Sequence, residues 1–209
     1  MAYWWVNHKQ TRDHEVRGDT LWSPRRNQNG ARNQSYDNMA LAQPGDVVYS
    51  YANGVLGAVG IVIARASPCP KPTEFGSVGD YWSNDGWLLP VAFTELERPV
   101  RPKDHIGLIA PLLPHLHSPI QRNGNGNQGV YLAAIPVVLG VTFASPSGNG
   151  GSKQQATHVL SCRATIAERL PSLGVRNGRV QASANRNARR LSGRSRDRGT
   201  GSDCRTYLP

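Results

Sequence analysis

The stretch "PGDVVYSYANGVLGAVGIV" (Pro44–Val62) decides the fold class. Pro-Gly-Asp is typical of a turn, and "VVYSY" after it is the β-branched and aromatic run that strands favour. Asn53–Gly54 is the strongest short hairpin signal in the chain, since such residues accept the positive φ angles of a two-residue turn. The run Val55–Ala66 is too apolar for a surface strand. We therefore predict a hairpin whose second strand is buried.

Further strand and helix signals surround this hairpin. "YWWVN" (Tyr3–Asn7) is a short aromatic strand signal, and Gly86–Leu96 is another strand candidate, in which Pro90 indicates an edge position or a bulge. Several strands with few helices indicate an α+β domain, a small β-barrel with short peripheral helices. The predicted short helices are Gln34–Leu41, Pro102–Ile109 and Leu132–Leu139.

The charge divides the 209 residues into two parts. Residues 1–140 hold 12 Lys+Arg against 11 Asp+Glu, whereas residues 141–209 hold 12 against 3. The second part is rich in Arg, Ser, Gly and Ala, and it offers too little apolar surface to offset the entropy of ordering. We predict a folded domain over 1–140 and a basic, low-complexity, disordered tail over 141–209. Translation of a GC-rich gene in a shifted frame is a second interpretation of the tail.

Membrane insertion and secretion are not expected. The sequence has no run of eighteen apolar residues, and its first thirty residues are charged and Asn-rich. Cys69, Cys162 and Cys204 are far apart and odd in number, which disfavours a disulfide scaffold and a zinc ribbon. The expected location is the cytoplasm.

Five blocks of sequence resemble one family. In chain order they are "YWWVN", "LWSPRRNQNGARNQSYDNM", "PGDVVYSYANGVLGAVGIV", "RPKDHIGLIAPLLP" and "SPIQRNGNGNQGVYLAAIP". Together they resemble the N-terminal EVE-like domain of bacterial HNH endonucleases of the modification-dependent restriction type, over roughly residues 3–139. EVE domains belong to the PUA-like superfamily. The resemblance implies a PUA-like β-barrel with an aromatic pocket that accepts a modified base.

The nuclease half of that family has no counterpart here. An HNH nuclease needs a general-base histidine and metal ligands, but the chain after residue 140 holds one histidine, His158. We therefore expect no catalytic residues, no metal ligands and no cofactor, apart from a divalent metal if a nuclease domain is supplied. A separate nuclease subunit or a homodimer is the expected protein partner.

Trp22 and Trp82 are the candidate walls of the base pocket. A duplex-reading protein must extrude the base, and stacking on aromatic rings then returns about 1–3 kcal/mol per base. Trp22, with Ser23 after it, stands in a polar, exposed-looking loop and matches the first cage tryptophan that the resemblance implies. The segment "DYWSNDGWLLPVAF" resembles the YTH block in which a loop tryptophan precedes a strand tryptophan, which makes Trp82 the second wall and leaves Trp87 for the barrel core. Exchanged roles of these two tryptophans, and Tyr81 as the wall, are the open alternatives. The alternative is that these rings pack as ordinary core residues.

Other polar residues are candidates for reading the base edge. Asn7 and Asn27 carry amides that can donate and accept together, although an asparagine in a Gly-rich loop is more often a turn former. Tyr49 and Ser50 end the first hairpin strand, where PUA-like domains place pocket residues. Because side chains alternate along a strand, only one of these two can face inward.

Cations near the Trp22 loop are candidates for phosphate contacts, which position a protein without specifying sequence. An ordinary solvated face and a flexible loop tip are the competing interpretations. The candidate backbone-binding residues are Lys9, Arg12, Arg25, Arg26, Arg32, Gln121 and Arg122.

Base-flipping recognition of DNA that carries a modified cytosine is the function that this sequence predicts, as the specificity part of an anti-phage restriction system. Three alternatives stay open: a complete or partner-assisted HNH endonuclease, a PUA-like module for modified RNA, and a tail that binds any polyanion.

Overall fold

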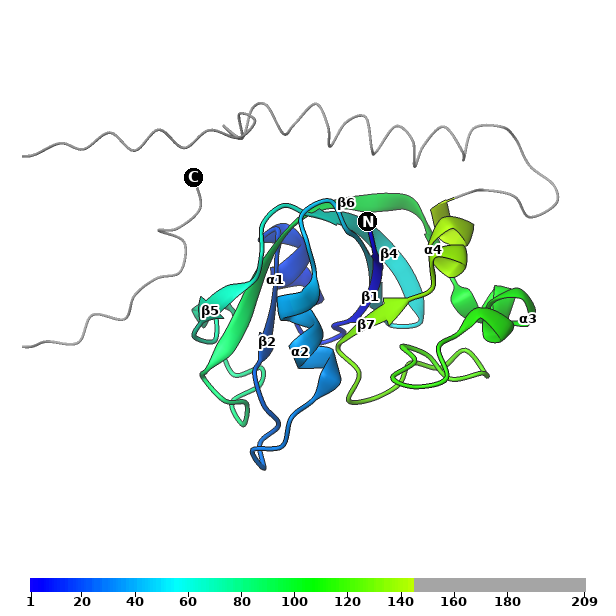
Figure 1. The fold of residues 1–209 in the computed structure, drawn as a ribbon. Coiled ribbons are helices and arrows are strands. Elements are labelled where there is room, and N and C mark those ends of the chain that lie inside the picture. The colour runs from blue at the N-terminus through cyan, green and yellow to red at the C-terminus, as the bar shows by residue number, and fades with distance from the viewer. Residues whose placement is uncertain (145–209) are drawn as a thin grey trace, which may run out of the picture.

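Seven strands form one curled, mixed sheet in the computed structural model, which describes residues 1–144 (Figure 1). The strand order is β2-β6-β4-β3-β1-β7, with β5 added beside β6. β1 and β3 are parallel, and the other pairs are antiparallel. The strands are β1 Tyr3–Asn7, β2 Thr20–Pro24, β3 Val47–Ala52, β4 Val55–Val62, β5 Ser67–Cys69, β6 Gly86–Val100 and β7 Leu132–Ile135.

Short helices lie around this sheet, so the predicted α+β class is confirmed. α2 begins where its sequence predicts, because Asn33 caps it by accepting a hydrogen bond from the Ser35 amide at 3.0 Å. The helices are α1 Arg12–Arg17, α2 Gln34–Leu41, α3 Ile106–Ile109 and α4 Val137–Ala144, with 3₁₀ turns at Thr73–Phe75 (η1), Pro102–His105 (η2) and Ala110–Leu112 (η3).

The predicted hairpin is confirmed. β3 and β4 pair up to Ala52 and Val55, and the two turn residues Asn53 and Gly54 have φ angles of 52° and 85°. Val59 and Leu56 are buried, as expected for a strand inside the sheet. The hairpin therefore forms the middle of the curled sheet.

Pro90 corrects one expectation. β6 is not an edge strand, since it lies between β2 and β4, and the register shift of the β4–β6 pair lies at Leu56/Ala58. Pro90 marks the place where β6 leaves β2 and starts to pair with β4 at Val91. A residue without an amide hydrogen is tolerated at this change of partner.

Three further expectations change. Leu132–Leu139 is not one helix: Leu132–Ile135 forms β7, and α4 starts after Pro136, which has no backbone N–H and is tolerated at the start of a helix, where that N–H would have no partner. Pro102–Ile109 divides into η2 and a single turn of α-helix. Trp22, expected in a loop, lies in β2.

The curled sheet buries side chains on both faces. Tyr49 lies with Trp5 and Leu139 on the face covered by α4, whereas Val48 lies with Trp4 and Met39 on the face covered by α2. The alternation expected at Tyr49 and Ser50 is thus present. The predicted tail falls outside the described residues from position 145 on. Within residues 1–144, no helix reaches the length and apolarity that a bilayer crossing demands.

Candidate functional site

Trp22 lies in a small cluster outside the main core. Its side chain is only 2% exposed, so the expectation of an exposed ring is wrong. The indole Nε1 donates to the Cys69 carbonyl oxygen at 3.0 Å. A Cβ on Gly86 would stand 2.3 Å from the Trp22 ring, so the ring rests directly on the β6 backbone. Strand pairing and this close contact fix Trp22 on a rigid element.

Trp82 stacks on Trp22. The two ring centroids are 6.2 Å apart with 28° between the planes, and Phe75 meets Trp22 edge-on at 6.0 Å. Trp82 is partly exposed, and Tyr81 packs against its edge while remaining 60% exposed. The structure therefore brings the two predicted tryptophans together, one on a strand and one on the loop 76–85.

Lys71 holds the loop that carries Trp82. Its Nζ donates to the carbonyl oxygens of Gly76 and Val78 and to Asp80 Oδ1, at 3.2, 3.1 and 3.0 Å. Gly79, with φ 69°, allows the loop to pass under the Trp82 ring, since a Cβ there would lie 2.0 Å from it. The position of Trp82 thus depends on a lysine that the sequence did not single out.

Ser23 and Arg25 lie on the opposite face of β2 from Trp22. Ser23 is opposite Trp87 in the β2–β6 pair, and its buried Oγ has no hydrogen-bond partner within residues 1–144. The Arg25 guanidinium lies 3.9 Å above the Trp87 ring, and its Nε is 3.3 Å from Asp85 Oδ1, an ion pair without hydrogen-bond geometry. Trp87 is partly buried and packs against the core cluster that contains Trp4 and Met39.

The side chains of Asn7, Tyr49 and Ser50 have hydrogen-bond partners other than the two tryptophans. The Asn7 amide donates to the carbonyl oxygens of Pro119 and Val130, which ties the two ends of the 118–130 loop to β1. Tyr49 donates to the Gly140 carbonyl oxygen at 2.7 Å, on the α4 face. Ser50 is fully buried, and its Oγ lies 2.7 Å from His8 Nε2.

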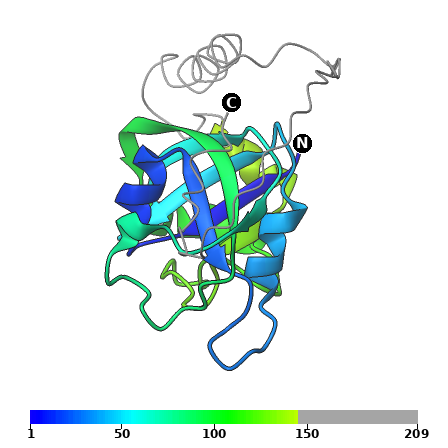
Figure 2. The same ribbon diagram turned by 90° about the vertical axis from the view of Figure 1, so that its left-hand side faces the viewer.

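The loop between β2 and α2 extends beyond the body of the domain (Figure 2). Asn27 acts as a turn former there: its backbone amide donates to the Ala31 carbonyl oxygen, and its side-chain Oδ1 accepts from Asn33 Nδ2. Arg26 donates to the Gly30 carbonyl oxygen. Arg32, at the far end of the loop, donates twice to Asp37 Oδ2.

The remaining candidate cations are distributed over other parts of the surface. Arg12 lies over Gly57 and pairs with Asp13 and Glu95, on the β4–β6 side of the domain. Lys9 is exposed just before α1, and Gln121 and Arg122 are exposed in the 118–130 loop. That loop touches the start of α2, because Asn33 Nδ2 and Ser35 Oγ both donate to the Gly129 carbonyl oxygen.

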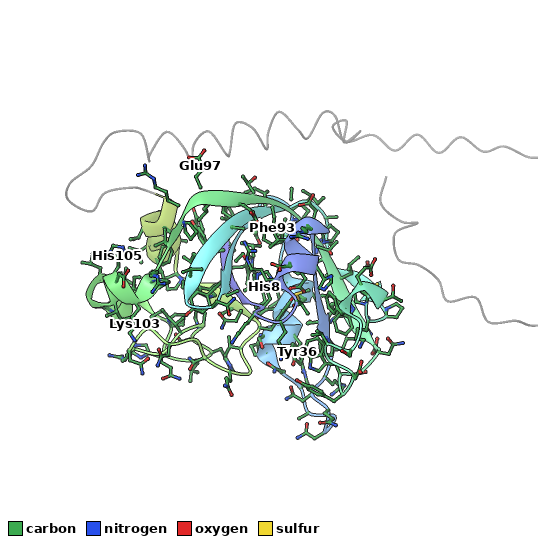
Figure 3. The ribbon with its side chains drawn as sticks, turned by 180° about the vertical axis from the view of Figure 1, so that it is seen from behind. His8, Tyr36, Phe93, Glu97, Lys103 and His105 are labelled. Atoms are coloured by element: carbon green, nitrogen blue, oxygen red, sulfur yellow. The ribbon has the colours of Figure 1, made fainter. Side chains whose placement is uncertain are left out.

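A buried polar network behind Trp22 was missed by sequence reasoning. Glu15, on α1, is 1% exposed and accepts hydrogen bonds from the Trp22 amide and the Tyr131 hydroxyl. His8 joins this network and lies inside the curled sheet, 6.4 Å ring to ring from Phe93 of β6 (Figure 3). Nothing in the local sequence distinguishes Glu15 from the surface acids Asp13 and Asp19 beside it.

Potential metal ligands do not cluster in the part of the chain that the structure describes: no group of three or more His, Cys, Asp or Glu side chains is placed to hold an ion. Lys103 and His105 lie at the α3 end of the molecule, far from Tyr36 on α2 in the view of Figure 3.

Comparisons with known proteins give low similarities. No family model matches the chain, and no curated protein matches it. Solved structures with a similar chain trace include a Pseudomonas putida protein, at 16% identity over 68% of this chain and 97% of that one, TM-score 0.44. The Pho92 YTH domain in complex with m6A shares 9% identity over 68% and 82%, TM-score 0.43. A hypothetical protein from Leishmania major shares 11% over 80% and 97%, TM-score 0.45.

Proposed function

We propose that residues 1–140 recognise a modified base, flipped out of DNA, at the Trp22–Trp82 pair. The observation that carries this proposal is that two tryptophans sixty residues apart, one on β2 and one on a loop, lie ring to ring. One of the five blocks that resemble EVE-like domains contains Trp22, and the segment "DYWSNDGWLLPVAF" resembles the YTH block with Trp82 as the second pocket ring. Aromatic rings on two sides of a base return enough stacking energy to offset much of the cost of extrusion.

Trp82 is the ring that moves when the base enters. Stacked rings need a separation of about 3.5 Å, so a base held between two indoles places their centroids about 7 Å apart. The 6.2 Å spacing and the 2% exposure of Trp22 leave no such gap in the described conformation. Trp22 is fixed by its pairing with β6, whereas Trp82 stands on a loop whose residues 76–80 are held by the side chain of Lys71. Displacement of Trp82 therefore opens the site.

We place the domain as the specificity part of an anti-phage HNH restriction endonuclease, with the nuclease supplied by another subunit, and modified cytosine as the base. Ser23 Oγ is buried without a hydrogen-bond partner within residues 1–144, but it lies on the face of β2 opposite to Trp22, so it is not among the proposed base contacts. Arg25, Arg26 and Arg32 on the neighbouring loop are the proposed phosphate contacts.

The test is a binding comparison with the full-length protein. Wild type, Trp82→Ala and Phe75→Leu are titrated at about 0.3 M salt, to suppress non-specific contacts, with duplexes that contain or lack one 5-methylcytosine. We expect wild type to prefer the modified duplex, Trp82→Ala to lose that preference by about tenfold, and Phe75→Leu, which keeps the stacked pair, to retain it.

Equal affinity of wild type for the two duplexes would overturn the proposal. Two further arms address the alternatives: a single-stranded RNA with the same modification tests an RNA reader, and DNA cleavage with Mg²⁺ by the purified chain tests a complete endonuclease.

A further inference from the structure

The curled sheet does not close into a barrel within residues 1–144. β2 and β7 are the two end strands, and each has one neighbour, β6 and β1 respectively. α2 lies between them in Figure 1 and packs against both. In an antiparallel pair every second residue turns its amide away from the partner strand. The Trp22 amide points away from β6 in this way, towards the open side of β2.

Two side chains take the place of the missing neighbour strand. The Trp22 amide donates to Glu15 Oε1 at 2.9 Å, and it lies 3.2 Å from the Tyr131 hydroxyl. The Tyr131 hydroxyl itself donates to the same Oε1 at 2.5 Å. Tyr131 directly precedes β7, so this group of atoms spans the opening between the two end strands.

The two oxygens of the Glu15 carboxylate have different partners. Oε1 serves Trp22 and Tyr131, whereas Oε2 accepts from Thr11 Oγ1 at 2.9 Å and lies 2.6 Å from His8 Nδ1. An ionised carboxylate can accept about four hydrogen bonds, so this one is fully satisfied despite its burial. Burial and the neighbouring Glu15 raise the pKa of Tyr131 well above its usual value, which keeps the phenol protonated as a donor.

The hydrogen-bonded series Ser50–His8–Glu15 has the same order of residue types as the catalytic triad of a hydrolase. Unlike such a triad, it is not accessible to a substrate. Ser50 is 0% exposed and His8 is 3% exposed, so a substrate cannot reach the serine. A nucleophilic role is excluded by this burial, and the network is left with the task of holding Glu15. Burying a charge costs several kcal/mol unless it is paired and hydrogen-bonded, and the four partners of Glu15 offset that cost.

We propose that Glu15 and Tyr131 are positioning residues for Trp22, holding its backbone in the place from which its ring meets the base. This inference rests on the proposed function of the Trp22–Trp82 pair. Since the Trp22 ring is pressed against Gly86 on one side, a shift of its backbone moves the ring relative to Trp82.

The chain offers a matched pair of variants. Tyr131→Phe and Thr11→Val each remove one hydroxyl that donates to Glu15, but only Tyr131 also contacts the Trp22 amide. Both variants are made in the full-length protein. The readouts are thermal stability, hydrogen exchange of the Trp22 amide by NMR, and affinity for duplexes with and without 5-methylcytosine.

For Tyr131→Phe we expect Trp22 amide exchange to accelerate by about tenfold and affinity for the modified duplex to fall five- to tenfold, with the unmodified duplex unaffected. For Thr11→Val we expect a comparable loss of stability without either effect. Equal effects of the two variants on exchange and discrimination, or none from Tyr131→Phe, would overturn the positioning role. The exchange measurement needs no DNA, so it decides the hold on Trp22 even if wild type fails to discriminate and the proposed function falls.

Discussion

Tyr131 joins the two ends of the sheet through one hydroxyl, and that hydroxyl must keep its proton to do so. Its pKa lies well above 10.0, because its burial and the Glu15 carboxylate both disfavour the phenolate. The folded state therefore holds this proton more tightly than the unfolded chain does. The stabilisation is complete below about pH 10 and declines as the pH rises towards the folded-state pKa.

Alkaline unfolding measures this contribution. Tyr36 and Tyr51 also have raised pKa values from burial, so wild type should lose stability above pH 10 through several groups. Tyr131→Phe removes one of them, and the decline should become shallower by up to about 1.4 kcal/mol per pH unit. Urea unfolding at several pH values between about 8 and 11 gives the slopes. An unchanged slope in the variant would contradict the assignment.

The Asp46 carboxyl group has a lowered pKa, so its contribution to stability depends on pH at the acid end of the range. Burial alone would raise the pKa of its carboxyl group, but hydrogen bonds from the Ala2 amide, Trp4 Nε1 and the Gln43 amide hold it below its usual value. The stability from these bonds is present above about pH 4 and is lost as the pH falls through the lowered pKa.

Asp46→Asn should therefore destabilise the domain by about 2–3 kcal/mol at neutral pH and flatten its acid unfolding. Asp37→Asn is the control, because that carboxylate forms an ion pair with the exposed Arg32 and should contribute less than about 1 kcal/mol. Denaturant titrations at pH 7 and at about pH 2.5, where the Asp46 carboxyl group of the unfolded chain is protonated, distinguish them. Equal losses in the two variants would show that the bonds to Asp46 contribute little.

At the scale of elements, β6 supports the candidate site, because it pairs with β2 and lies against the Trp22 ring. Its first residue, Gly86, leaves space for the Trp22 ring, and its later half pairs with β4. Gly86→Ala should push the ring aside, lower stability by about 1–3 kcal/mol and alter the near-ultraviolet circular dichroism of the stacked indoles. Gly107→Ala, in α3 and facing open space, should leave the spectrum unchanged and stability equal or slightly higher. Identical spectra for both variants would rule out the close contact.

The elements that sequence predicts well here are those with local signals. The Asn53–Gly54 turn and the Asn33 cap are fixed by the backbone angles and hydrogen bonds of a few adjacent residues. β2 is different, because "TLWSP" is surrounded by polar residues and becomes a strand by pairing with β6, far along the chain. The sequence does not predict β7 either, because β7 becomes a strand by pairing with β1 at the other end of the domain sequence.

The candidate site follows the same division. Trp22 and Trp82 were singled out through a resemblance, and the structure places them ring to ring. Glu15, Lys71 and Tyr131 were not, because their importance comes from burial and partners on distant segments. Asn7 was expected at a base edge, whereas its amide organises a loop. A sequence pattern identifies residue types, but the partners of buried polar groups are decided by tertiary contacts.

At the scale of the whole molecule, charge and candidate site are separated. Residues 141–209 carry a net charge of +9 out of the +10 of the chain, while the tryptophan pair belongs to a nearly neutral part. A cationic segment attracts any phosphate backbone, and this attraction weakens steeply with salt. General affinity for nucleic acid and discrimination of a base should therefore be separable.

Removing residues 145–209 tests this separation. The shortened protein should bind unmodified DNA more weakly, with a smaller slope of log affinity against log salt, and should keep its ratio of affinities for modified and unmodified duplexes. Electrophoretic or fluorescence titrations at several salt concentrations measure both quantities. Loss of the ratio together with the slope would assign recognition to the tail.

The open side of β2 has one more consequence. An uncovered edge strand offers its amides to any other extended chain, and such edges start aggregation. Here the Trp22 amide is already occupied by a buried carboxylate and a phenol. We therefore expect a variant that removes the Glu15 and Tyr131 partners of this amide to lose solubility at high protein concentration.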